Sequence, residues 1–165
     1  MIYAVEDAIM RKDISTLRLL ITAGWSPHSV LTFIVTHGDA ESAKQLIHEL
    51  NADKLQILHS VYVDFGMDML QRFIPAVTDG CRELLTACSV GDIDFAKTLA
   101  AAGVNPSEAL LLAVSESKAG AITLLLSLGA NPSDAATHAL ITGYNRASQL
   151  LFTLGYSGQV AHDRE

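Results

Sequence analysis

Two segments of this chain are nearly identical, and their spacing constrains the fold more than any other feature. They are LAAAGVNPSEAL at 99–110 and LLSLGANPSDAA at 125–136, and their glycines, Gly103 and Gly129, define a period of 26. Further steps of about this length reach Gly155 in one direction and Gly24 in the other. Six units therefore fill the chain, near 2–27, 28–53, 54–80, 81–106, 107–132 and 133–158. Because a unit this short cannot bury its apolar side chains alone, we expect the units to stack on one another as a solenoid.

A second column of turn residues divides each unit into two halves. Glycine occupies this column in four units and is replaced in two, in the order Lys12, Gly38, Gly66, Gly91, Ser117 and Gly143. Each unit thus reads as a helix, a tight turn, a second helix and a closing glycine loop. The pattern predicts an all-α fold of about twelve short helices without a sheet, and helices this short need packing to be stable.

The residues near the closing loops predict where helices begin and end. The serines that follow the two Asn-Pro pairs, Ser107 and Ser133, are predicted to be N-cap residues. The prolines at 27, 106 and 132 are expected to stop the preceding helix, and the glycines before them to adopt a left-handed conformation. In the third unit, Pro75 is expected to end or kink the second helix.

Two stretches with these features resemble a known family. LLTACSVGDIDFAKTLAAAGVNP (84–106) and LLLAVSESKAGAITLLLSLGANP (110–132) are similar to the body of an ankyrin repeat. The Thr-Pro-Leu-His start of that repeat is absent, and the period is 26 instead of 33. The missing residues are those that build the projecting β-hairpin finger. The resemblance therefore implies an ankyrin-like helix stack with trimmed fingers, in which the inner helices line a concave binding face.

Charge and hydropathy exclude several classes of function. The 165 residues carry a formal charge of −7 without a Lys/Arg cluster, which disfavours binding to nucleic acid or to an anionic membrane. No apolar run reaches the roughly 18 residues of a membrane span, and the first residues lack the features of a signal peptide. We therefore expect a cytoplasmic protein whose partner is another protein, with either a basic surface or an inserted helix or loop.

The sequence contains no recognisable catalytic motif. It has no phosphate-binding loop, dinucleotide fingerprint, HExxH or GxSxG segment. Cys81 and Cys88 are seven residues apart on one predicted helix, about 10 Å along its axis, which is too far for a disulfide. The spacing of the histidines fits no zinc pattern. We therefore expect two reduced thiols, no metal, no cofactor and no enzymatic activity.

The candidate binding residues are two columns on the inner helices. The first contains Asp7, Phe33, Val61, Thr86, Leu112 and His138, and the second, four residues later, contains Arg11, His37, Phe65, Val90, Glu116 and Thr142. By the ankyrin resemblance these columns line the concave face. The predicted partner site comprises Phe33, His37, Val61, Phe65, Val90, Leu112, Glu116, His138 and the single tryptophan, Trp25. The alternative is that some of these side chains pack between units, and that Trp25 covers the open core of the first unit.

The leading hypothesis is a protein-binding module, for example an inhibitor, an immunity protein or an effector, that holds its partner in the concave face. A structural or self-associating repeat protein is the first alternative, and an enzyme with an unrecognised carboxylate or histidine site is the second. The oligomeric state is left open between a monomer and a weak dimer. The segment 159–165 is expected to be a polar tail.

Overall fold

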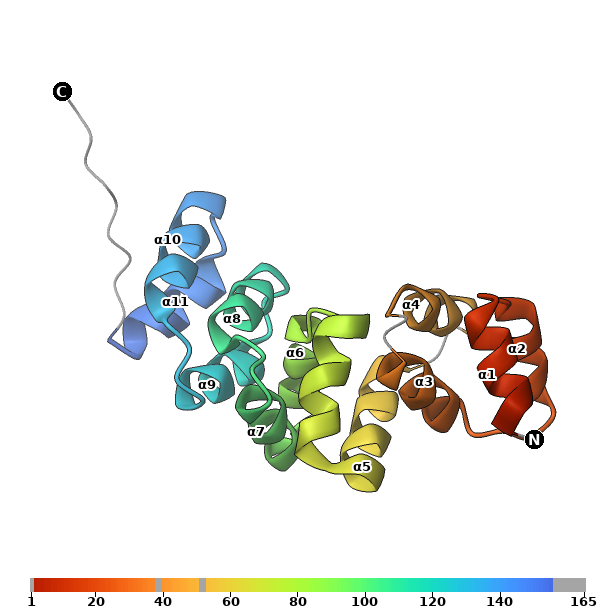
Figure 1. Cartoon of the computed structure of the whole chain (residues 1–165). Coiled ribbons are helices and arrows are strands. Elements are labelled where there is room, and N and C mark those ends of the chain that lie inside the picture. Colours follow the sequence, from red (N-terminus) through yellow and green to blue (C-terminus); the bar gives the residue numbers. More distant parts are fainter. Residues whose placement is uncertain (1, 38–39, 51–52, 156–165) are drawn as a thin grey trace. The chain divides into compact units, whose positions relative to one another are not determined.

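The described part of the chain is built of α-helices. The computed structural model describes residues 2–37, 40–50 and 53–155, and within them it contains eleven helices and no strand (Figure 1). The predicted all-α fold is therefore confirmed. The chain divides into two compact units, Met1–Asp79 and Gly80–Glu165, and the division falls one residue before the boundary between the predicted segments 54–80 and 81–106. The predicted tail at 159–165 and the turn at Gly38 lie outside the described residues.

The first compact unit, Met1–Asp79, contains α1 (Ile2–Met10), α2 (Ile14–Thr22), α3 (Pro27–Thr36), α4 (Ala40–Glu49) and α5 (Lys54–Val77). Helix α2 packs against α1, α3 and α4, while α5 packs against α3 and α4. The core of this compact unit consists of side chains that are almost completely buried, among them Leu17, Leu31, Ile34, Leu46, Leu58, Leu70 and Phe73. Every helix from α2 to α5 contributes to this list, so the unit has one continuous core.

Helix α5 is two helical segments joined at a break. Gly66 has φ 82° and ψ −174°, which lies outside the helical region and interrupts the helical backbone. The predicted mid-unit turn at Gly66 is therefore present, and the eleven described elements contain twelve helical segments. The expectation that Pro75 ends its helix is wrong, because the helix continues two residues further to Val77. The non-helical conformation at Gly66 strains residues that carry a Cβ, whereas glycine tolerates it. The break in α5 therefore occurs at this glycine.

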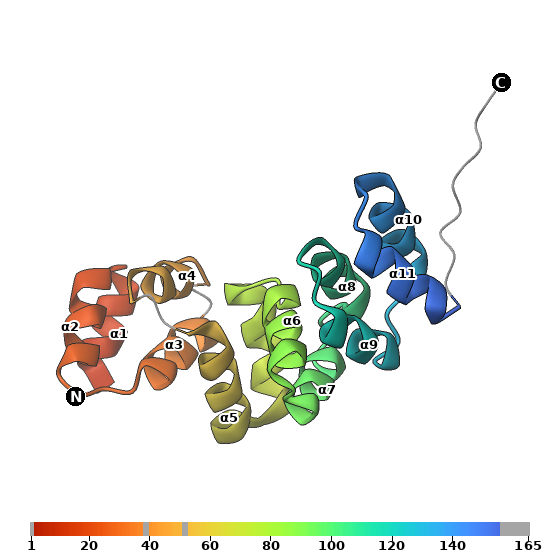
Figure 2. The ribbon, with the colours of Figure 1, turned by 180° about the vertical axis from the view of Figure 1, so that it is seen from behind.

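The second unit contains three antiparallel helix pairs. They are α6 (Cys81–Val90) with α7 (Ile93–Ala101), α8 (Pro106–Ser115) with α9 (Ala119–Ser127), and α10 (Pro132–Thr142) with α11 (Asn145–Thr153). First helices pack side by side in the order α6, α8 and α10, and α9 packs against α11 (Figure 2). The core contains Leu84, Leu99, Leu110, Ile122, Leu125 and Leu151, all at most 1% exposed. Corresponding helices of the last two pairs start one sequence period apart, at 106 and 132 and at 119 and 145.

The residues that start these helices differ from those expected. The side chains of Asn105 and Asn131 accept hydrogen bonds from the backbone N–H of Ser107 and Ser133, at 3.0 and 3.1 Å. The asparagines are thus the N-caps, and the serine prediction is wrong. The prolines at 27, 106 and 132 begin helices α3, α8 and α10 instead of merely stopping earlier ones. Proline suits the first helical position because its fixed φ is helical and its missing N–H has no partner to lose there.

The turns between paired helices follow the second column of the sequence. Gly91 and Gly143 end α6 and α10 in the left-handed region, with φ of 82° and 74°. Lys12 and Ser117, which replace glycine in this column, are the two described non-glycine residues with positive φ, at 54° and 56°. The sign of φ is therefore the same whether or not glycine occupies the position.

Candidate functional site

In the first unit, the predicted residues on α3 form a small aromatic surface. The rings of Phe33 and His37 lie 4.1 Å apart between centroids, with their planes tilted by 33°. His37 Nδ1 lies 2.8 Å from the Phe33 carbonyl oxygen, and because a carbonyl only accepts, Nδ1 carries the proton. Phe33 is half-buried and His37 is exposed. The pair therefore forms a hydrogen-bonded, partly apolar surface at the end of α3.

The two predicted residues on α5 have opposite environments. Phe65 is 45% exposed and directly precedes the break at Gly66, whereas Val61 is completely buried. The expected exposure of Val61 is wrong. Helix α3 begins at 27 and α5 at 54, so Val61 corresponds to the buried Ile34 and not to Phe33. One residue rotates a side chain by about 100° on a helix, which moves Val61 from the surface into the core.

Trp25 lies in the loop between α2 and α3. Its backbone N–H donates to the Leu20 carbonyl at 3.1 Å, following Gly24, which has φ 101°. The side chain is half-buried. Partial burial is compatible with both functions considered for it, a cover for the core of the first helix pair and a contact for a partner.

In the second unit, the predicted residues lie along α6 and α8. Val90 is 69% exposed at the end of α6, and Leu112 is half-buried on α8. Glu116, at the end of α8, accepts a hydrogen bond from the Arg82 guanidinium at 3.0 Å, and both side chains are partly exposed. Arg82 and Val90 lie two turns apart on the same side of α6. The ion pair between Arg82 and Glu116 therefore extends across the predicted binding face. An exposed pair of this kind contributes only about 0–1 kcal/mol to stability.

His138, on α10, is the last predicted residue. Its ring stacks on Tyr144 with centroids 6.0 Å apart, and its Nδ1 atom is buried without a hydrogen-bond partner. The ring is otherwise half-buried. The structure thus brings Phe33 and His37 together at the end of α3, and places Leu112 and Glu116 near the end of α8, with Val90 on the neighbouring α6.

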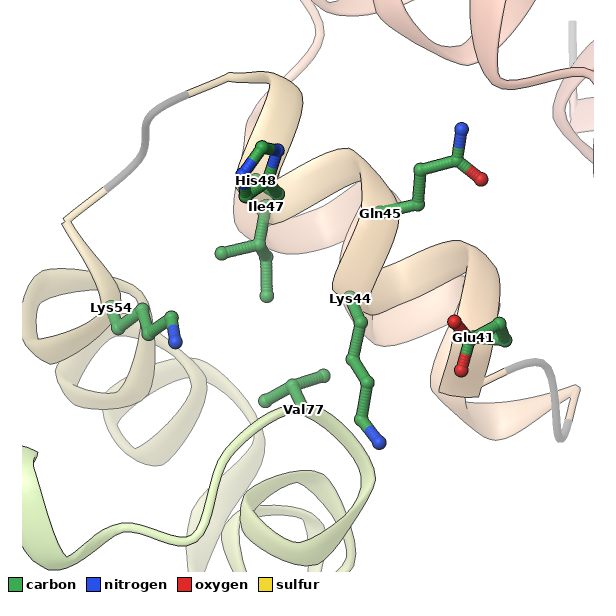
Figure 3. A pocket seen from close by; sticks show the side chains of 7 residues that line it. All are labelled: Glu41, Lys44, Gln45, Ile47, His48, Lys54 and Val77. Atoms are coloured by element: carbon green, nitrogen blue, oxygen red, sulfur yellow. The ribbon is translucent and has the colours of Figure 1, made fainter.

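The structure adds a shallow pocket that the sequence did not predict. It lies between α4 and the two ends of α5, has a volume of about 760 Å³, and is lined by Glu41, Lys44, Gln45, Ile47, His48, Lys54 and Val77 (Figure 3). Ile47 and Val77 are the buried members, and the polar side chains are exposed. Helix spacing alone could not reveal this pocket, since Lys54 and Val77 lie at opposite ends of a broken helix.

The two cysteines lie seven residues apart on α6. Cys81 and Cys88 are buried on α6 and form no disulfide, and burial raises the pKa of the Cys88 thiol to about 11. Cys81 Sγ donates to the Glu108 carboxylate at 3.4 Å. Among the described residues, no three His, Cys, Asp or Glu side chains are grouped as metal ligands. Within the same residues, no helix has both the length and the apolar character needed to cross a bilayer.

Comparison with known proteins gives no assignment. No family model, curated protein sequence or solved structure matches the chain at a significant level.

Proposed function

We propose that this chain is an ankyrin-like helical repeat protein that binds another protein through its inner helices, and that it acts by binding instead of catalysis. The observation that carries the proposal is the exposure of apolar side chains at the ends of first helices in both units. Phe65 is 45% exposed and Val90 is 69% exposed. The predicted columns therefore offer exposed apolar area in both compact units. A partner that covers this area gains about 25 cal/mol of binding free energy per Å² removed from water.

The neighbouring residues support a specific contact. Phe33 and His37 lie on α3, which packs against the helix of Phe65, and Leu112 and Glu116 lie on α8, which packs against the helix of Val90. Both sets combine apolar area with ordered polar groups. Interfaces typically have an apolar centre with aromatic residues and a polar rim. The formal charge of −7 favours a partner with a basic surface, because opposite charge speeds the encounter.

The repeat architecture is part of the proposal. It is supported by the near-constant offset of 25–27 residues between the starts of successive first helices and by the positive φ at every described turn of the second column. The two cysteines form no disulfide, which is consistent with a reducing compartment, and we propose a cytoplasmic location.

A crosslinking comparison tests the binding face. A photoreactive amino acid placed at Val90 should capture one discrete protein from an extract of the source cells, whereas the same group at Lys97 on α7 should not. Both positions are exposed and in the same unit, so general stickiness would affect them equally. Capture from Lys97 alone, or equal capture of many proteins from both positions, would refute the proposed face.

Alanine variants then measure the energy. Phe65→Ala should weaken binding of the captured partner by about 1–3 kcal/mol, since a few aromatic residues usually dominate an interface. Lys97→Ala should leave the affinity unchanged. Far-UV circular dichroism of both variants should match that of the wild type, which separates loss of binding from loss of fold.

A further inference from the structure

The pocket between α4 and α5 of the first compact unit differs in charge from the chain as a whole. The chain has 18 acidic residues against 11 lysines and arginines. The described residues that line the pocket include two lysines, Lys44 and Lys54, and one acidic residue, Glu41. His48, which also lines the pocket, adds a positive charge when it is protonated. A local excess of positive charge in an acidic chain favours an anionic ligand at this pocket.

The two lysines lie beside an apolar floor. Figure 3 shows the Ile47 side chain directed toward Val77, with the side chains of Lys54 and Lys44 on either side of Val77. Each lysine carries its charge on a flexible hydrocarbon stem, which adds apolar surface to the walls while the ammonium group stays at the rim. The pocket therefore combines a continuous apolar surface with two positive charges.

The ammonium groups of the pocket are open to a ligand. Neither Lys44 nor Lys54 forms an ion pair with another described residue. The carboxylate next to Lys54 in sequence, that of Asp53, accepts hydrogen bonds from the backbone N–H groups of Leu55 and Gln56 at 3.0 and 3.3 Å and so caps α5. A ligand anion would therefore supply a charge partner that the described part of the chain does not.

The volume and the lining together select a chemical class of ligand. The volume of about 760 Å³ lies within the range of about 300–1,000 Å³ that is usual for small-molecule pockets. An inorganic anion would leave the apolar floor in water, and an uncharged hydrocarbon would leave both ammonium groups without a partner. A molecule that has both a hydrocarbon chain and an anionic group satisfies both parts of the pocket.

We propose that this pocket binds a small aliphatic carboxylate. The carboxylate group of the ligand accepts hydrogen bonds from the Lys44 and Lys54 ammonium groups, and its hydrocarbon chain covers Ile47 and Val77. None of the pocket residues belongs to the inner-helix columns. The site is therefore separate from the proposed partner-binding face and does not depend on it.

Isothermal titration calorimetry of the full chain with three probes separates the two contributions. Octanoate carries both the hydrocarbon chain and the charge, acetate carries the charge alone, and octan-1-ol carries the chain alone. Octanoate should bind at one site per chain, and the other two probes should each bind at least about tenfold more weakly. Added salt should weaken the binding of octanoate, because ion pairs with exposed lysines are screened.

A matched pair of double variants tests the role of the lysines. Combining Lys44→Gln with Lys54→Gln should weaken octanoate binding about tenfold, as expected for the loss of two exposed ion pairs, and should leave octan-1-ol binding unchanged. The control combines Lys97→Gln with Lys118→Gln, which removes the same charge from exposed positions of the second unit and should not change octanoate binding. Circular dichroism of both double variants should match that of the wild type.

Three calorimetric results would overturn the proposal. They are a wild type that does not bind octanoate, octan-1-ol binding as tight as octanoate binding, and an equal loss of affinity in the two double variants. Methyl NMR then locates the ligand, because octanoate should shift the signals of Ile47 and Val77. Shifts confined to other residues would place octanoate outside this pocket and would overturn the proposal as well.

Discussion

Replacing glycine by alanine at two positions should change stability in opposite directions. Gly91 ends α6 with φ 82°, whereas Gly120 lies within α9 without a positive φ. At both positions an added Cβ would meet no atom within 4 Å. The chemical change and the free space are therefore the same, and only the backbone conformation differs.

The magnitudes follow from the backbone alone. A left-handed conformation costs a residue with a Cβ about 1–2 kcal/mol, and alanine recovers about 0.4–1 kcal/mol by restricting the unfolded chain. Gly91→Ala should therefore lower the free energy of unfolding by about 0.5–1 kcal/mol. Gly120→Ala should raise it by about 0.4–1 kcal/mol, because Gly120 lies in the first turn of α9 without a positive φ and alanine restricts the unfolded chain.

A third variant tests the same reasoning in reverse. Ser117 occupies the equivalent turn between α8 and α9 with φ 56° and is exposed, so glycine should relieve its strain. Ser117→Gly is expected to raise the free energy of unfolding by about 0.5–1 kcal/mol, and each kcal/mol corresponds to about 2–4 °C in Tm.

Urea denaturation followed by circular dichroism measures all three variants. The midpoint should shift while the slope stays constant, since neither the surface exposed on unfolding nor the fold changes. If Gly91→Ala and Gly120→Ala shift the midpoint in the same direction, the assigned turn conformation is incorrect. If Ser117→Gly destabilises the protein, the cost ascribed to its positive φ is also incorrect.

Three further results are expected. Leu99→Ala or Leu125→Ala should each cost about 2–5 kcal/mol in urea denaturation, because both side chains are completely buried; a loss below about 1 kcal/mol at both would contradict the packing. Cys88 should react slowly with a thiol reagent at neutral pH and quickly in denaturant, since burial raises its pKa to about 11; rapid labelling of the folded protein would be inconsistent with this. Asp13 caps α2, and its hydrogen bonds with Thr16 hold the pKa of its carboxyl below the ordinary 3.8. The ionised carboxylate therefore stabilises the fold at neutral pH. This stabilisation is lost as the pH falls through the lowered pKa. Asp13→Asn should therefore flatten the acid limb of a plot of stability against pH, and an unchanged limb would count against this assignment.

The helices could be predicted because the sequence repeats its turn residues. The substitutions at Lys12 and Ser117 did not obscure the turns, since the period of 26 identified the positions, and the structure gives both a positive φ. The exact capping residue could not be read from composition. Asparagine and serine are comparable N-caps, and the outcome was decided by proline, which takes the first helical position and leaves the residue before it as the cap.

The candidate face was predicted less completely than the helices. Phe65 and Val90 are exposed as expected, but Val61 is buried because the column was counted from the turn glycine and not from the start of α5. A single residue of offset leaves a periodic pattern intact and yet turns a side chain from solvent to core. The exposed Leu140 on α10 and Phe152 on α11 were missed for another reason, since neither residue belongs to the two inner-helix columns.

The local character of the packing has a consequence for how the chain folds. In the described part of the chain, the main partners of each helix lie within the next three helices along the sequence, as for α6 with α7, α8 and α9. Only short loops must close to form such contacts, so the entropic barrier is low and folding is expected to be fast for a chain of this length. During synthesis, each emerging pair could bury its apolar side chains against the preceding one before the remaining residues leave the ribosome.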